Sequence, residues 1–199
     1  MSSCPEGALR VKPGKNSLKN ALKKAKENGI SVIFLENGVH TFDHKDENGN
    51  NCIYLLIDFP ITIIGESKDG CTIIGGLMMK GKKEDDVNVK HLTISQSKGS
   101  GVNGEGMSFH LFHLKIEKSK GYGVYVNYTK RNTMSNCQVS HSKESGVVAD
   151  DGLITMNGNG TSIHNNVTEG ESDSYGLDTA FFSSSSSIHL VSPLTKESV

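Results

Sequence analysis

Three segments with the same pattern of hydrophobic and polar positions follow one another between residues 87 and 147. Each segment alternates hydrophobic and polar residues, slips by two positions, resumes the alternation and ends in a polar loop. The loops lead to Gly101-Val102, Gly123-Val124 and Gly146-Val147, so the glycines stand 22 and 23 residues apart. A fixed period of this size indicates an architecture of stacked, equivalent units.

The period inside each segment predicts strands rather than helices. Alternation with a period of two places successive side chains on opposite faces of a strand, and the slip marks a corner between two short strands. No segment shows the 3.6-residue period that helical repeats require. Three short strands per coil, paired in parallel with the next coil, predict an all-β fold, a right-handed single-stranded parallel β-helix. Polar residues at one corner, His91, His113 and Asn136, should form a column, and His164 is expected to recur there.

The repeat resembles that of the pectin lyase-like superfamily of parallel β-helix proteins. The earlier part of the chain is similar to the opening of that superfamily, with apolar runs at residues 32–35, 60–65 and 71–75. The resemblance covers residues 14–180. It implies the fold rather than one activity, because this fold carries lyases, hydrolases, esterases and binding proteins without catalytic activity.

The pattern divides the chain into four parts. These are a flexible N-terminus at residues 1–13, a capping α-helix at 14–31, the β-helix domain at 32–180 and a serine-rich tail at 181–199 that is either disordered or a truncated end. We expect Ser17 to cap the start of the helix and Gly29 to end it. Its apolar face would cover the open first coil of the β-helix.

Composition and charge exclude some partners. The chain has 199 residues, of which 35% are hydrophobic, and a net charge of −1. With nearly balanced charges, the protein has no strong positive electrostatic potential to attract nucleic acid or an anionic membrane. The lysines at 19, 23, 24 and 26 are interpreted as a solvated helix face. The sequence shows neither an apolar signal segment nor a transmembrane stretch, and the compartment stays open.

The alternation predicts which side chains point outward from the strands that start at the glycine–valine pairs. One outward column comprises Met78, Asn103, Tyr125, Val148 and Asp178, and a second comprises Lys80, Glu105, Asn127, Asp150 and Ala180. In the superfamily that the chain resembles, ligands lie along this outer face. We therefore expect Asn103, Tyr125, Asn127 and Asp178 to contact a ligand, with ring stacking by Tyr125 and polar contacts by the others.

The acidic residues of the same face support an enzymatic alternative. Asp150-Asp151 resembles the paired aspartates of polygalacturonase-type hydrolases, with Asp178 one coil on and Glu105 two coils back. In an enzyme, one of these four carboxyls would protonate the leaving oxygen and another would activate water. Converging carboxylates would also suit Ca²⁺, the one cofactor considered; no other cofactor and no metal site are expected. The further motifs of hydrolases, lyases and methylesterases with this fold are absent.

The sequence thus favours a binding or structural β-helix domain that contacts an extended carbohydrate, a polysaccharide or glycan, along its outer strand face. The first alternative is a polysaccharide hydrolase or lyase of the pectin lyase-like type. The second is a segment of a fibre or surface protein whose open end pairs with another chain, in an end-to-end or homo-oligomeric contact.

Overall fold

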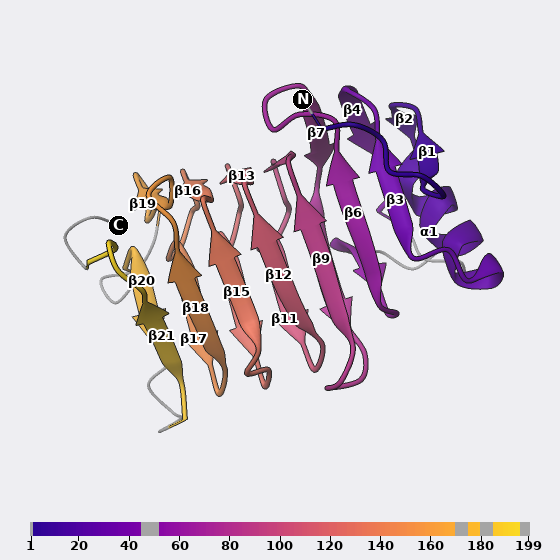
Figure 1. Cartoon of the computed structure of the whole chain (residues 1–199). Coiled ribbons are helices and arrows are strands. Elements are labelled where there is room, and N and C mark those ends of the chain that lie inside the picture. The colour runs from indigo at the N-terminus through magenta and orange to yellow at the C-terminus, as the bar shows by residue number, and fades with distance from the viewer. Residues whose placement is uncertain (1, 45–51, 170–174, 180–184, 196–199) are drawn as a thin grey trace.

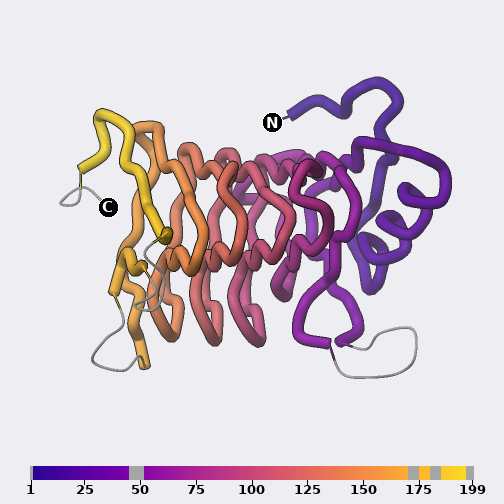
Figure 2. Tube along the Cα trace, turned by 90° about the horizontal axis from the view of Figure 1, so that it is seen from below, coloured from indigo at the N-terminus to yellow at the C-terminus, as the bar shows by residue number. Residues whose placement is uncertain are grey.

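The computed structural model describes residues 2–44, 52–169, 175–179 and 185–195. In these residues the chain winds through short strands into a stack of similar coils, with one helix at the N-terminal end (Figure 1). A second view shows the coils following one another from that helix to the C-terminal strands (Figure 2). Every pairing between the described strands is parallel. The predicted all-β parallel β-helix with an N-terminal helix is confirmed.

Three sheets form the sides of the stack. The eight-stranded sheet has the order β1 (Leu9–Val11), β3 (Val32–Leu35), β6 (Ile61–Gly65), β9 (Asp86–Lys90), β12 (Ser108–Phe112), β15 (Asn132–Ser135), β18 (Leu153–Asn157) and β21 (Ser187–Leu190). The seven-stranded sheet has the order β19 (Ser162–His164), β16 (Gln138–Ser140), β13 (Lys115–Glu117), β10 (Thr93–Ser95), β7 (Cys71–Ile74), β4 (Gly38–Thr41) and β2 (Gly14–Lys15). The six-stranded sheet has the order β20 (Leu177–Thr179), β17 (Val147–Asp150), β14 (Val124–Asn127), β11 (Val102–Glu105), β8 (Gly76–Lys80) and β5 (Tyr54–Ile57).

The core is a column of inward-facing side chains that repeats from coil to coil. Val102 pairs with Val124, and Val124 pairs with Val147, so the three valines stack in register. All three are fully buried. Their inward position, predicted from the alternation, is confirmed.

Glycine precedes each of these valines because the next coil passes too close for a side chain. A Cβ atom on Gly123 would lie 2.5 Å from the backbone oxygen of Gly146, and one on Gly101 would lie 2.8 Å from that of Gly123. Real Cβ atoms do not approach backbone oxygens this closely. The repeated glycine in the sequence therefore reflects the close contact between coils at this corner.

The corner between the eight-stranded and seven-stranded sheets is made by residues in the left-handed conformation. His91, His113 and Asn136 have φ angles of 56°, 56° and 52°, and they form the predicted column. The Nδ1 atoms of His91 and His113 lie 3.1 Å apart. The expectation for His164 is wrong, since it pairs with Ser140 inside the seven-stranded sheet. A single left-handed residue turns the chain here, so the corner accepts several polar residue types.

The helix α1 (Ser17–Asn28) lies against the first strands and buries one face, comprising Leu18, Ala21, Leu22 and Ala25. Gly29, with a φ of 65°, ends the helix as predicted. The predicted cap is wrong, because Asn16 precedes the helix in a left-handed conformation and makes no side-chain cap. The Ser17 hydroxyl instead donates to the backbone oxygen of Gly14 at 3.0 Å.

Strands begin before residue 32, where the sequence analysis placed the start of the β-helix. β1 pairs with β3 and β2 pairs with β4, so residues 9–11 and 14–15 already belong to the sheets. In the tail, β21 pairs with β18, while residues 181–184 and 196–199 lie outside the described residues. Flexibility of residues 1–13 and disorder or truncation of the tail stay predictions.

A buried histidine lies beside the start of α1, with its Nδ1 3.4 Å from Ser17 Oγ. His40, on β4, is 1% exposed, and its Nε2 donates to the backbone oxygen of Glu36 at 2.9 Å. Burial lowers the pKa of His40 below its ordinary value. The folded protein therefore holds this ring in its neutral form.

We expect the protein to lose stability as the pH falls below about 6.5, the pKa of histidine in an unfolded chain. Below this pH the unfolded chain binds a proton at His40, whereas the folded chain, with its lower His40 pKa, does not. Protonation therefore favours the unfolded state, and stability is lost progressively until the pH falls below the pKa of the folded form. Urea unfolding between pH 7.5 and 5 measures the effect. The His40→Gln variant should show a flatter profile, and an unchanged profile would contradict the assignment to His40.

Candidate functional site

The pairings on the six-stranded sheet place the predicted outward residues in two columns. The first, named here the Tyr125 column, comprises Met78, Asn103, Tyr125, Val148 and Asp178 in consecutive coils. The second, the Asp150 column, comprises Lys80, Glu105, Asn127 and Asp150. The predicted register is confirmed up to this point, and Ala180 lies outside the described residues.

Two stacked tyrosines form the centre of this face. The rings of Tyr122 and Tyr125 lie 5.4 Å apart between centroids, with 23° between their planes. Tyr125 is half-buried, and its hydroxyl donates to Asp150 Oδ2 at 2.7 Å. Burial and the hydrogen bond to Asp150 raise the pKa of Tyr125, so the phenol stays protonated and acts as a donor. Tyr128, the third tyrosine of the sequence cluster, is 58% exposed and lies at the next corner with a φ of 58°.

Carboxylates lie close to the tyrosine pair. Burial raises the pKa of Tyr122, and Glu144, Asp178 and Asp150 raise it further. Glu144 was missed by the sequence analysis because it lies in a polar loop, outside the strand alternation. Its position follows from loop stacking, as its backbone N–H donates to the oxygen of Gly121 at 3.3 Å. The pair is therefore an aromatic surface bordered by negative charge.

The candidate catalytic carboxyls have separate partners. Glu105 forms an ion pair with Lys80 at 2.9 Å, and the Asp151 carboxylate accepts a hydrogen bond from the Ser185 hydroxyl. Asp178 pairs with Val148 and not with Asp150, and its Oδ2 accepts from Ser145 at 3.5 Å. Within the described ranges, no three His, Cys, Asp or Glu side chains are arranged to hold a metal ion, so the convergence that a Ca²⁺ site requires is not found there.

The accessibility of the Tyr125 column varies along its length. Val148, between Tyr125 and Asp178, is buried at 3% exposure although it points outward. Asn103 and Asn127 are half-buried, and their side-chain oxygens make no hydrogen bond to any of the described residues. Buried amide oxygens usually have a hydrogen-bond partner in the protein, in water or in a ligand, and the contact of Asn103 and Asn127 with a ligand stays a prediction.

Comparison with known proteins places the chain among β-helix structures. Residues 45–191 match the family described as "Right handed beta helix region". A solved structure titled "Crystal structure of Agl-KA catalytic domain" superimposes with a TM-score of 0.65 over 89% of this chain, at 14% sequence identity. The chain spans 35% of the length of that structure, and the likeness concerns the fold alone. No curated protein matches the chain.

Among the described residues, no helix is both long and apolar enough to cross a membrane.

Proposed function

The chain belongs to the right-handed beta helix family, and we propose that it is a binding domain that contacts an extended carbohydrate along the outer face of the six-stranded sheet. The observation that carries this proposal is the stacked pair of Tyr122 and Tyr125 beside Asp150. An aromatic surface accepts the apolar face of a sugar ring, and adjacent carboxylates accept hydrogen bonds from its hydroxyls.

The spacing of the coils supports an extended ligand. Adjacent coils of a parallel sheet lie ~4.8 Å apart, and Asn103, Tyr125 and Asp178 belong to one column on this face. Asn103 and Tyr125 lie in adjacent coils, and Asp178 lies two coils beyond Tyr125, past the buried Val148. Polar or aromatic groups therefore mark three of four consecutive coils along a line that an extended sugar chain can follow. The net charge of −1 favours a glycan over nucleic acid.

Cleavage of a polysaccharide is the alternative that the acidic residues suggest. Glu105 and Asp150 are in register with Asn127 between them, which puts their backbones two coils, or about 10 Å, apart. A separation near this value approaches the upper limit for an inverting pair of carboxyls. Glu105 is held by Lys80 and Asp150 by Tyr125, so binding is favoured over catalysis. The solved structure named above is a catalytic domain, which makes the enzymatic assay worthwhile.

Replacing Tyr125 by alanine should weaken glycan binding by roughly 1–3 kcal/mol, the loss typical of a central aromatic anchor. A glycan array identifies a ligand, and titration calorimetry on the wild type and variant then gives the loss. Tyr125→Phe should keep most of the affinity, because it removes only the hydrogen bond to Asp150. Tyr128→Ala is the matched control, since this exposed ring lies outside the stack.

Equal affinity of wild type and Tyr125→Ala would overturn the binding proposal, and so would a loss of affinity fully explained by a lower melting temperature. A reducing-end assay on the same glycans tests the alternative. If the wild type releases reducing ends and the Asp150→Asn and Asp178→Asn variants do not, the face is an active site rather than a binding surface.

A further inference from the structure

Two histidines from neighbouring coils face each other at the corner between the eight-stranded and seven-stranded sheets. The Nδ1 atoms of His91 and His113 lie 3.1 Å apart, and their rings meet edge to face at 89°. His91 is half-buried and His113 is exposed, so the pair is open to water on one side. Neither the proposed carbohydrate contact nor the family match assigns a role to this histidine pair.

The backbone holds both members of the pair in equivalent positions. Each has a φ angle of 56°, so both side chains leave the corner in the same way. The N–H of His91 donates to the oxygen of Phe112 at 3.1 Å, and that of His113 donates to the oxygen of Ser135 at 2.9 Å. The Phe112 ring lies edge to face with both imidazoles, with centroids 5.3 and 6.2 Å away. The stacking of the coils therefore positions the two rings before any ligand arrives.

The contact between the rings places a constraint on their protons. A neutral imidazole has one donor and one acceptor nitrogen, so one of the two Nδ1 atoms carries a proton and the other offers its lone pair. Burial lowers the pKa of His91, and the charges of His113 and Lys90 lower it further. His91 is therefore neutral at pH 7, in the protonation state that a metal-binding histidine needs.

The distance between the two nitrogens fits a shared metal ion. A transition metal binds imidazole nitrogen at about 2.0–2.1 Å. At bond angles of about 90–109°, two such bonds place their nitrogens about 2.9–3.4 Å apart. The observed 3.1 Å falls within this range. In the part of the chain that the structure describes, no third His, Cys, Asp or Glu side chain completes a group around an ion, so water or an outside ligand would fill the other positions.

We propose that His91 and His113 bind one divalent transition-metal ion, Cu²⁺, Zn²⁺ or Ni²⁺, through their Nδ1 atoms. As the ion binds, the proton between the rings moves through solvent to Nε2 of its own ring, so both imidazoles stay neutral. Ca²⁺ and Mg²⁺ are not expected there, because these ions take oxygen ligands. The proposal replaces the sequence-based expectation that the chain has no metal site, and it is independent of the carbohydrate contact.

Titration calorimetry of the whole chain with metal chlorides at pH 7.5 tests the chemistry of the site. One equivalent of Cu²⁺ should bind most tightly and Zn²⁺ and Ni²⁺ more weakly, the order typical of nitrogen ligands. Mg²⁺ should bind at least about tenfold more weakly than Zn²⁺. The absence of binding by all three transition metals would overturn the proposal, and so would equal binding of Mg²⁺ and Zn²⁺.

Variants locate the ion. His91→Asn and His113→Asn should each lose at least about tenfold in Zn²⁺ affinity, because one of two protein ligands is removed. Asparagine suits this corner, since Asn136 holds the equivalent position in the next coil with a φ of 52°. His164→Asn is the control, because it removes an exposed histidine of the seven-stranded sheet and should leave the affinity unchanged.

Two outcomes would show that the assigned site is wrong. One is an equal loss of Zn²⁺ affinity in all three variants, which would indicate binding to surface histidines in general. The other is an unchanged affinity in both His91→Asn and His113→Asn. Circular dichroism of each variant shows that it is folded, so a loss of affinity can be assigned to the missing ligand.

Discussion

Replacing Val124 by aspartate should unfold the β-helix or bring it close to unfolding. Val124 is fully buried, and it stacks between Val102 and Val147 in the core column. An aspartate there would place a carboxylate among apolar side chains without a partner. Leaving a buried charge uncompensated costs about 3–5 kcal/mol, which is a large part of the 5–15 kcal/mol that typically separates folded and unfolded states.

The matched control is Val39→Asp, because Val39 lies on β4 and is 52% exposed. This substitution introduces the same charge into a strand but leaves it in contact with water, so its effect should stay small. Urea unfolding followed by circular dichroism gives the free energy of unfolding for both variants. Similar values for the two would contradict the inward position of Val124.

The coil architecture could be predicted from the sequence because the β-helix repeats its local rules. The three central coils share a glycine where the next coil passes close, an inward valine after it and a polar residue at the left-handed corner. These requirements recur at about the same spacing, so the sequence carries them as a period. The register of Asn103, Tyr125 and Asp178 followed from that period, although their role in binding stays a proposal.

The errors arise where a single residue, and not the period, decides the structure. His164 has the residue type of the corner column, yet the coil after Asn136 places Gly158 at the left-handed position, with a φ of 85°. At the helix start Ser17 is a good cap by residue type, but Asn16 adopts the left-handed conformation and Ser17 falls inside the helix. Residue preference cannot separate such neighbouring alternatives.

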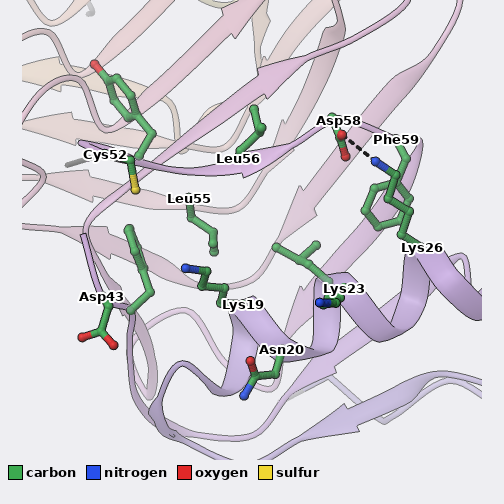
Figure 3. A pocket seen from close by; sticks show the side chains of 13 residues that line it. Lys19, Asn20, Lys23, Lys26, Asp43, Cys52, Leu55, Leu56, Asp58 and Phe59 are labelled. Carbon is green, nitrogen blue, oxygen red and sulfur yellow. Dashed lines mark hydrogen bonds and ion pairs between the residues drawn. The ribbon is translucent and has the colours of Figure 1, made fainter. Parts of the chain in front are cut away.

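A cavity between α1 and β5 (Figure 3) could not be predicted, because its wall comes from elements that are distant in the sequence. Lys19 and Lys23 belong to α1, whereas Leu55 belongs to β5, and only the folded chain sets them opposite each other. Spacing in the sequence does place the lysines on one side of the helix. It does not say whether that side meets water or another element.

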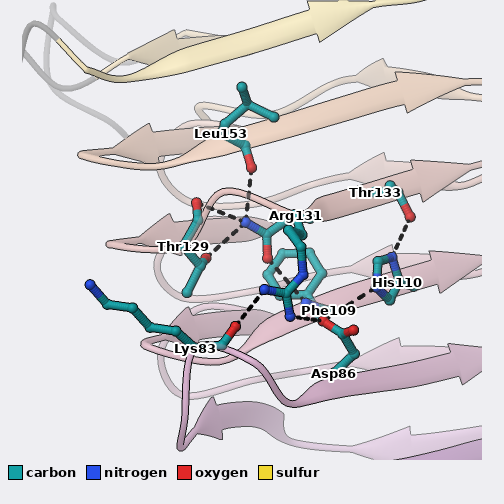
Figure 4. Close-up of polar contacts among 9 residues, drawn as sticks. Lys83, Asp86, Phe109, His110, Thr129, Arg131, Thr133 and Leu153 are labelled. Carbon is teal, nitrogen blue, oxygen red and sulfur yellow. Dashed lines mark hydrogen bonds and ion pairs between the residues drawn. The ribbon is translucent and has the colours of Figure 1, made fainter.

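Asn132 is a further residue that the pattern does not single out, and it connects three coils. It is 1% exposed and lies on β15, at an inward position paired with Ile154. Its side-chain oxygen accepts from the backbone N–H of Phe109 at 3.1 Å, and its amide nitrogen donates to the backbone oxygen of Leu153 at 2.8 Å. The same nitrogen donates to Thr129 Oγ1 at 2.8 Å. Figure 4 labels the partners Phe109, Thr129 and Leu153, beside the Arg131–Asp86 ion pair.

Replacing Asn132 by leucine should therefore lower the free energy of unfolding by about 3 kcal/mol or more, although leucine has a similar size and suits an apolar core. The buried N–H of Phe109 and the oxygen of Leu153 would each lose a partner, and an unsatisfied buried polar group costs about 1–3 kcal/mol. Asn88→Leu, on the outer face of β9, is the control and should change stability little. Chemical unfolding of both variants decides the matter. If Asn132→Leu is as stable as the wild type, the coils are held together by apolar packing, and the asparagine contributes no net stability.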